Sequence, residues 1–300
     1  MSAITNVALA GATGNLGPAI LEQLLKAGFQ VTVLTRQGST HEFPAPVTVK
    51  PVNYDSVESL TAALKGQDAV VSTLAAVAIS KQLNLVEAAA KANIRRFIPS
   101  DFGSDISNPK NAKLAVFADK VTVQKALAEE AARGTLSYTS IYNGPFFDWG
   151  LRAGLIANIP EKSVALYDGG ERRFSTTTLE SVGRAVAGVL RNAEATKNRA
   201  VYVQNAAPTL RELKAAAEKV TGGGAWQGKV VSVVDDVLAP AYAELEKASP
   251  DPQKFAIPMI IASIWGEGAG GHFQKLDNEL LGIKEFTEAE IEAVVAAATK

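Results

Sequence analysis

The chain has 300 residues, enough for one large domain or two modest ones. Apolar residues make up 47% and charged residues 20%, and the formal net charge is −1, which is the balance of an ordinary globular protein. The basic residues are scattered, there is no cysteine and there are only two histidines, so the composition argues against nucleic-acid binding, a disulfide framework and a zinc site.

No segment approaches the roughly 18 uninterrupted apolar residues of a membrane span. The chain begins with a strand-like segment and not with the basic and apolar regions of a secretory signal. We therefore expect a cytoplasmic protein, without a bound metal, that acts on a small molecule and not on a membrane or a nucleic acid. A monomer and a homodimer are both compatible with the sequence.

Apolar runs alternate with amphipathic segments through the first third of the chain. The apolar, β-prone runs lie at 4–10, 31–34, 47–52, 69–74 and 96–98. Segments with helical spacing lie between them, at 16–25, 56–64 and 82–92. Gly28 is typical of a helix end, and Ser56 is typical of a helix N-cap. Because parallel neighbours need crossover helices, this alternation predicts an α/β fold with a doubly wound parallel sheet.

The pattern continues with a helix near 117–132 and a strand near 136–141, and it changes after residue 143. Beyond that point we expect helices at 181–190 and 210–220, a strand at 200–203 and a looser, largely helical C-terminal region. The sequence thus predicts a Rossmann-type domain over 1–150 and a smaller, mainly helical substrate-binding lobe over 151–300. Segments of about 173–204 are expected to return to the main sheet.

A glycine motif, Gly11-Ala-Thr-Gly14-Asn-Leu-Gly17, follows the first predicted strand and opens the first predicted helix. This is the context in which such glycines bind a dinucleotide, because they permit a tight turn, a close backbone approach to the pyrophosphate and close packing of the helix. Free N–H groups at the helix start then face the phosphates. The alternative is a glycine turn without a ligand. The cofactor-binding candidates in the motif are Gly11, Thr13, Gly14, Asn15, Leu16 and Gly17.

The end of the second predicted strand indicates the type of dinucleotide. NAD-binding sites commonly place a carboxylate there for the ribose hydroxyls, whereas this chain has Arg36. A guanidinium can bind a 2′-phosphate in a bidentate manner. We therefore expect NADPH as the cofactor, the alternative being that Arg36 is a solvated loop residue.

Ligands of α/β sheets bind at the carboxyl ends of the strands, and this rule supplies further candidates. The additional cofactor-binding candidates are Thr73, Leu74, Asn143 and Pro145. The substrate-binding candidates, which include members of an aromatic cluster and of a glycine-rich loop, are Asp101, Phe102, Phe146, Trp149 and His272. The alternatives are a turn position for the aspartate, an ordinary core cluster for the aromatic residues and a surface position for the histidine.

No tyrosine of the chain is followed by a lysine four positions later, so the Tyr-x-x-x-Lys pair of ordinary short-chain dehydrogenases is missing. Lys120 offers another acid/base group, because at helical spacing it shares a stripe with Val116, Val123 and Leu127 and so interrupts an apolar face. Burial there would lower the pKa of its ammonium group towards a catalytically useful range. The alternative is a lysine whose stem packs while its charged end reaches water.

Five features, taken in chain order, resemble one family. They are the glycine motif, Arg36, Arg96-Phe-Ile-Pro-Ser-Asp-Phe-Gly103, Phe117-Ala-Asp-Lys120 and Leu276-Asp-Asn-Glu-Leu-Leu-Gly282. With them the chain resembles the NmrA-like branch of the atypical short-chain dehydrogenases, and in particular the isoflavone reductase and phenylcoumaran benzylic ether reductase group. The resemblance implies NADPH as the cofactor and Lys120 as the catalytic acid/base beside the nicotinamide. Two departures are Asp101, where the plant enzymes have glutamate, and Ala45, near a position where they have a second basic residue.

The resemblance implies an NADPH-dependent reductase that acts on an aromatic or heteroaromatic small molecule, such as an activated enone, a quinone methide or a benzylic ether. Such an activity would suit secondary metabolism. The alternatives are a non-catalytic NADP-binding regulatory sensor of the NmrA type and a redox-neutral isomerase that uses the same pocket. Because regulators of this type tend to lack the lysine, Lys120 favours an enzyme.

Overall fold

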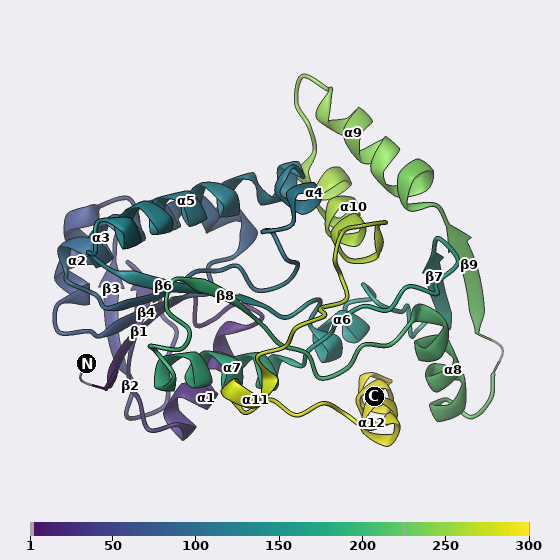
Figure 1. The fold of residues 1–300 in the computed structure, drawn as a ribbon, viewed down its shortest axis with the longest axis horizontal. Coiled ribbons are helices and arrows are strands. Elements are labelled where there is room, and N and C mark those ends of the chain that lie inside the picture. Colours follow the sequence, from purple (N-terminus) through teal and green to yellow (C-terminus); the bar gives the residue numbers. More distant parts are fainter. Residues whose placement is uncertain (1–2, 225, 300) are drawn as a thin grey trace.

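A seven-stranded parallel sheet forms the body of the computed structural model, which describes residues 3–224 and 226–299 (Figure 1). The strands lie in the order β3-β2-β1-β4-β5-β6-β8, and every neighbouring pair is parallel. They are β1 (Asn6–Ala10), β2 (Gln30–Arg36), β3 (Thr48–Val52), β4 (Ala69–Ser72), β5 (Arg96–Ile98), β6 (Ser137–Tyr142) and β8 (Arg199–Tyr202). The order reverses between β1 and β4, which places a crevice at the carboxyl ends of these strands. The predicted doubly wound α/β fold is confirmed.

Helices cover both faces of the sheet (Figure 1). One layer consists of α1 (Gly17–Lys26) and α7 (Leu179–Arg191). The other consists of α2 (Val57–Leu64), α3 (Gln82–Lys91) and α5 (Ala118–Ala132). Val7 belongs to the core under the first layer and Ala8 to the core under the second, so successive residues of β1 face opposite layers. Because both faces are buried, the central strands β1 and β4 are almost entirely apolar, whereas β6 and the edge strand β3 carry polar residues.

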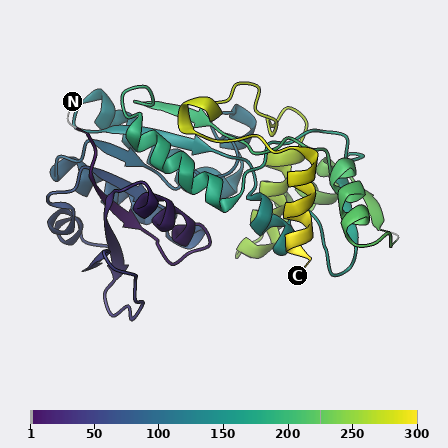
Figure 2. The same cartoon turned by 90° about the horizontal axis from the view of Figure 1, so that it is seen from below.

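Most of the C-terminal third, together with β7, forms a second lobe, which extends from one end of the sheet (Figure 2). Its helical elements are α8 (Leu210–Val220), η3 (Val233–Leu238), α9 (Ala239–Leu245), α10 (Pro252–Trp265) and α12 (Glu288–Ala298). A two-stranded parallel sheet of β7 (Ser163–Tyr167) and β9 (Gln227–Val231) accompanies them and was not predicted from the sequence. β9 is largely exposed and lacks an apolar run, so its pairing is set by the lobe and not by its own residues.

The remaining helical segments are short connections. They are η1 (Ala76–Lys81), α4 (Pro109–Ala112), η2 (Ala115–Phe117), α6 (Phe147–Arg152) and α11 (Asn278–Leu281). The expected N-cap of α2 is present, since the Ser56 hydroxyl oxygen accepts the N–H of Ser59 at 3.1 Å. Within the described residues, no helix is both long and apolar enough to cross a membrane.

Arg96 ties the middle of the sheet to the segment after α7. Its side chain is 2% exposed and donates to the hydroxyl oxygens of Ser137, Thr139 and Thr196 at 2.9–3.0 Å, as well as to the carbonyl oxygen of Ala193. Burial lowers the pKa of Arg96 to about 10, so the guanidinium remains charged at neutral pH. This buried cation therefore depends on its neutral hydrogen-bond acceptors to remain in the core.

Candidate active site

The turn between β1 and α1 has a shape that requires glycine. Gly11 has φ +84°, and a Cβ atom there would lie 2.6 Å from the carbonyl oxygen of Thr73. The Thr73 hydroxyl donates to the carbonyl oxygens of Ala10 and Gly11, each 2.9 Å away. A Cβ atom on Gly17 would lie 2.3 Å from the Gly11 carbonyl oxygen, so the start of α1 packs directly on the turn. Gly14, which lies between Gly11 and Gly17 in the sequence, is exposed.

An open groove of about 540 Å³ runs from this turn to the ends of β2 and β4. The predicted cofactor residues that line it are Gly11, Thr13, Gly14, Arg36, Thr73 and Leu74. Among its charged residues, Asp55 and Lys81 form an ion pair with each other, while Arg36 is exposed at the end of β2. The groove therefore carries a positive charge where an anionic group of a ligand would bind.

Some groove residues were not singled out from the sequence, among them Tyr54, Val77 and Lys81. The Tyr54 hydroxyl donates to the carbonyl oxygen of Leu34 at 3.0 Å, and burial raises the pKa of this tyrosine. Val77 is 96% exposed and lies on η1, beside the groove. No motif marks these positions, because their place depends on how the loops after β3 and β4 fold back over the strand ends.

Other cofactor candidates lie outside the groove. Asn15 is exposed on the turn, and the Leu16 side chain is 6% exposed in the core, so Leu16 could offer a ligand only its main-chain N–H. Asn143 is fully buried. Its Oδ1 accepts the N–H of Gly103 at 3.1 Å, and its Nδ2 donates to the carbonyl oxygen of Gly144 at 2.7 Å. Asn143 therefore joins the loops after β5 and β6 and does not face the groove.

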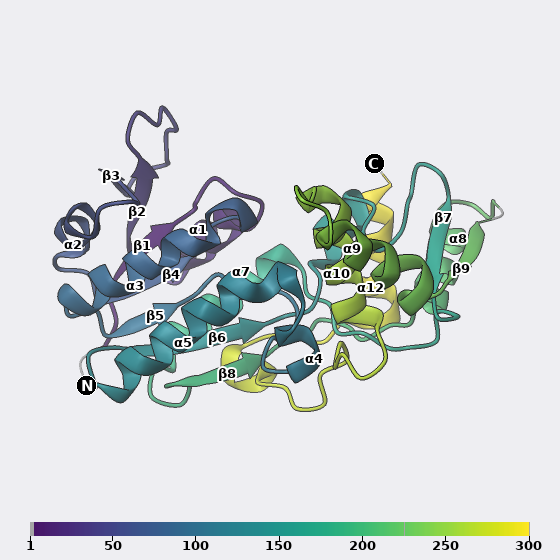
Figure 3. The same cartoon turned by 90° about the horizontal axis from the view of Figure 1, so that it is seen from above.

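A second pocket, of about 390 Å³, is lined by residues of the loops after β5 and β6 and of helix α10. Helix α10 belongs to the second lobe, beside the end of the sheet (Figure 3). The predicted residues that line it are Phe102, Lys120, Pro145, Phe146 and Trp149. The rings of Phe146 and Trp149 meet edge to face, with centroids 6.4 Å apart. The structure thus brings the candidate acid/base and the aromatic candidates into one cavity.

The opposite wall of this pocket comes from the C-terminal lobe. Helix α10 contributes four isoleucines, and the end of β7 contributes Tyr167. The isoleucines are Ile257, Ile260, Ile261 and Ile264. They follow the spacing of a single helix face, so the sequence does mark a stripe here, but such a stripe ordinarily packs in a core and does not by itself indicate a pocket.

Lys120 extends from the start of α5 into the second pocket. Its ammonium nitrogen lies 3.3 Å from the carbonyl oxygen of Asp101 and 3.5 Å from that of Phe102, and 5.9 Å from the centroid of the Phe117 ring. Burial lowers the pKa of Lys120, and the negative charge of Asp101 opposes this shift. Because the side chain is still partly exposed, Lys120 can exchange a proton with a bound molecule.

Two substrate candidates do not line this pocket. His272 is partly exposed in the loop before α11, where its Nδ1 lies 3.1 Å from Nε2 of Gln274.

Asp101 is 1% exposed, and its Oδ2 accepts from Nε2 of Gln124 at 2.7 Å. The same nitrogen donates to the hydroxyl oxygen of Tyr142 at 2.8 Å. Burial raises the pKa of Asp101, and the charge of Lys120 opposes that shift, so this carboxyl group acts on the lysine through charge.

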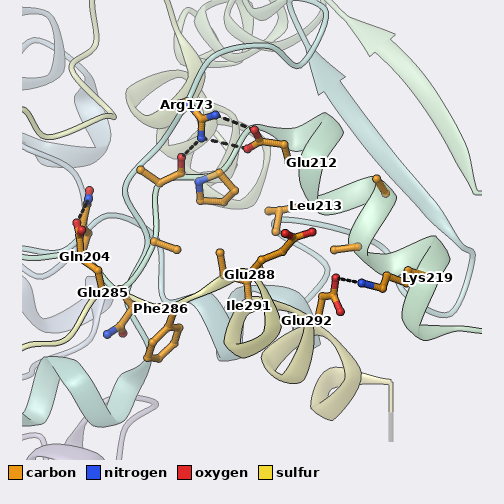
Figure 4. Close-up of a pocket in the computed structure, with 16 residues that line it drawn as sticks. Arg173, Gln204, Glu212, Leu213, Lys219, Glu285, Phe286, Glu288, Ile291 and Glu292 are labelled. Atoms are coloured by element: carbon orange, nitrogen blue, oxygen red, sulfur yellow. Dashed lines mark hydrogen bonds and ion pairs between the residues drawn. The ribbon is translucent and has the colours of Figure 1, made fainter.

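A larger cavity, of about 650 Å³, lies between α8 and α12 (Figure 4). Four of its charged side chains form ion pairs with one another. Arg173 donates to both carboxylate oxygens of Glu212, at 2.7 and 3.1 Å, and Lys219 forms an ion pair with Glu292 at 2.6 Å. None of the predicted site residues lines this cavity. We therefore place the candidate active site at the pocket of Lys120 and not here.

Comparison with known proteins agrees with this architecture. Residues 4–242 match the model of the NmrA-like family. The chain is 31% identical over 300 residues to the oxidoreductase aprR of Aspergillus flavus, with 98% of each chain covered. It is 26% identical over 291 residues to phenylcoumaran benzylic ether reductase PT1 of Pinus taeda, with 91% of each covered. Among solved structures, the NADPH complex of leucoanthocyanidin reductase from Vitis vinifera has a TM-score of 0.79 at 20% identity, covering 97% of this chain and 99% of that one.

Fold and relatives together define a Rossmann-type oxidoreductase. More narrowly, the chain belongs to the NmrA-like family. The predictions of this family, of the fold and of oxidoreductase activity are thereby confirmed.

Proposed function

We propose that the chain is an NADPH-dependent reductase that transfers a hydride to an aromatic or heteroaromatic small molecule, with Lys120 as the general acid/base. The observation that carries the proposal is the position of Lys120, whose ammonium group is the one charged group lining an otherwise mostly apolar pocket in the described chain. The relatives named for benzylic ether reduction and the neighbour bound to NADPH support the same assignment.

The residues of the first groove fit a phosphorylated dinucleotide. The turn at Gly11 and Gly17 leaves no room for side chains, which suits a close approach of the pyrophosphate to the backbone. Arg36 is exposed at the end of β2, where it would pair with a 2′-phosphate. When bound, NADPH supplies the hydride.

In this reaction Lys120 would supply the proton that accompanies the transferred hydride. Reduction of an enone, a quinone methide or a benzylic ether places negative charge on a substrate oxygen, and a protonated lysine beside that oxygen would neutralise it. The lowered pKa of Lys120 makes its proton easier to donate than that of an ordinary lysine. The carbonyl oxygens of Asp101 and Phe102 orient the ammonium group.

The walls of the pocket suit a flat aromatic substrate. Phe102, Phe146 and Trp149 lie on one side and the isoleucines of α10 on the other. Burying a ring between these groups provides binding free energy through removal of apolar surface from water.

The test is oxidation of NADPH in the presence of a panel of enones, quinone methide precursors and aromatic benzylic ethers. We expect turnover with at least one of them, and we expect Lys120→Ala to reduce kcat at least about a hundredfold while NADPH still binds. Lys125→Ala is the matched control, because Lys125 lies on the same helix and is exposed. Tight NADPH binding without any turnover would overturn the proposal and favour a regulatory sensor.

A further inference from the structure

Ser104 occupies a fixed position on the wall of the Lys120 pocket. It is 9% exposed and lies in the loop after β5. The preceding residue holds this loop in place, because the Gly103 carbonyl oxygen accepts the N–H groups of Asn143 and Gly144 at 3.2 and 3.0 Å. The N–H of Gly103 donates back to Oδ1 of Asn143. Ser104 is therefore presented to a ligand by a rigid segment.

The hydroxyl group of Ser104 has a partner that determines its direction. Its oxygen lies 2.7 Å from the hydroxyl oxygen of Ser263 on α10, which is 1% exposed. Ser263 also lies 2.7 Å from the carbonyl oxygen of Ile260. A carbonyl oxygen can only accept, so the single proton of Ser263 is donated to Ile260. The proton between the two serines must then come from Ser104.

This arrangement leaves Ser104 with lone pairs and no free proton. The other polar side chains that line the pocket are those of Lys120, Trp149 and Tyr167. Each carries an N–H or O–H group and can donate to a ligand. Among the described lining side chains, Ser104 is therefore the one that offers an acceptor alone.

We propose that the Ser104–Ser263 pair is a specificity-determining element that makes the pocket select aromatic ligands carrying a hydroxyl group over the corresponding methyl ethers. A ligand hydroxyl can donate to Ser104. A methoxy group would instead place an acceptor opposite the Ser104 oxygen, which is also an acceptor, and would leave both oxygens without a donor. The inference rests on the proposed use of this pocket for an aromatic substrate.

Binding of matched ligands tests the inference without requiring catalysis. The probes are the three chalcones with a hydroxyl group at position 2, 3 or 4 of the ring on the alkene carbon and their three methyl ethers, titrated into the protein saturated with NADP⁺ and followed by calorimetry. We expect at least one hydroxychalcone to bind about tenfold more tightly than its ether, the factor that corresponds to one net hydrogen bond. Ser104→Ala should abolish this preference.

Ser263→Ala is the more specific test, because it should strengthen the binding of the methyl ethers and not only abolish the preference for the hydroxychalcones. Without Ser263 the Ser104 proton has no internal acceptor and becomes free to point into the pocket. The methyl ethers should then bind several times more tightly than they bind the wild type. A preference caused only by the larger size of the methoxy group would not respond in this way. Ser107→Ala is the control, since Ser107 is exposed on the same loop and does not line the pocket.

The outcomes separate this inference from the proposed reductase activity. Equal affinities of hydroxychalcones and ethers in the wild type, a preference that survives Ser104→Ala, or no binding of either ligand would overturn the inference. A preference that disappears in Ser104→Ala and relaxes in Ser263→Ala would support it, even if no chalcone were reduced by NADPH. Reduction of the chalcones without any preference would leave the reductase proposal standing and refute the serine pair.

Discussion

The ammonium group of Lys120 lies 3.3 Å from the main-chain carbonyl oxygen of Asp101, and the buried carboxyl group of the same aspartate acts on it through charge. One residue thus orients the lysine through its backbone, and its carboxyl group opposes the lowering of the lysine pKa by burial. The side chain is held by Gln124, which also contacts Tyr142. Changes at Asp101 should therefore alter the pH dependence of the enzyme.

Asp101→Asn should make Lys120 lose its proton at lower pH. The negative charge of Asp101 raises the pKa of Lys120, against the effect of burial, so removing the charge leaves burial unopposed and the pKa falls further. If the protonated lysine donates to the substrate, kcat decreases as pH rises through this pKa. The decreasing limb of the kcat–pH profile should therefore move to lower pH in the variant.

Two further variants control this measurement. Asp101→Glu keeps the charge, so the decreasing limb should stay close to its wild-type position. Asp119→Asn removes an exposed charge from α5, the helix that carries Lys120, and should leave the pH profile unchanged. A limb that stays in place in Asp101→Asn would show that the aspartate does not set the charge state of Lys120.

Arg36→Asp should change the cofactor preference. Loss of a charge-assisted hydrogen bond to the 2′-phosphate, with repulsion added, should weaken NADPH binding by about tenfold to a hundredfold. NADH binding should hold or improve, because a carboxylate can accept from the ribose hydroxyls. The measurement is Kd for both cofactors by calorimetry, with Arg36→Lys as a control that keeps the charge. Unchanged NADPH affinity in Arg36→Asp would mean that Arg36 does not bind the phosphate.

The parallel sheet could be predicted because its strands are buried on both faces. Runs such as 69–74 are apolar except for Ser72 and Thr73, and helical segments separate most of these runs, so the alternation is visible without any contact information. Lys120 could be found for a related reason, since a charged residue in an apolar helical stripe contradicts the local pattern.

Features that depend on distant partners could not be predicted. β9 has no apolar pattern of its own and pairs with β7, more than sixty residues earlier. The buried side chain of Asn143 accepts the N–H of Gly103 across the loops after β5 and β6, a contact that no local pattern predicts, and its place beside the cofactor stays a prediction. In each case a tertiary contact, which no local spacing encodes, decides the position of the side chain.

Arg96→Met should destabilise the fold without changing a residue that lines the glycine-turn groove or the Lys120 pocket. The variant leaves the hydroxyl groups of Ser137, Thr139 and Thr196 without their buried donor, and we expect a loss of about 2–5 kcal/mol in the free energy of unfolding. Arg184→Met is the matched control, because that arginine is 55% exposed and its ion pair with Glu180 should contribute less than about 1 kcal/mol. Urea denaturation measures both. Equal effects would show that the buried network does not stabilise the sheet.

Gly144→Ala should be more damaging than an alanine at an open glycine of similar backbone geometry. Gly144 has φ +64°, and a Cβ atom there would lie 1.9 Å from the carbonyl oxygen of Ser175, so the loop that carries Pro145 must move. Gly134 has φ +76° with open space around its Cβ position, so Gly134→Ala isolates the cost of the backbone angle, about 1 kcal/mol. We expect Gly144→Ala to lose more than about 3 kcal/mol in urea denaturation. If both variants lost the same amount, the close approach to Ser175 would carry no cost, and the loop would be freer than its contacts indicate.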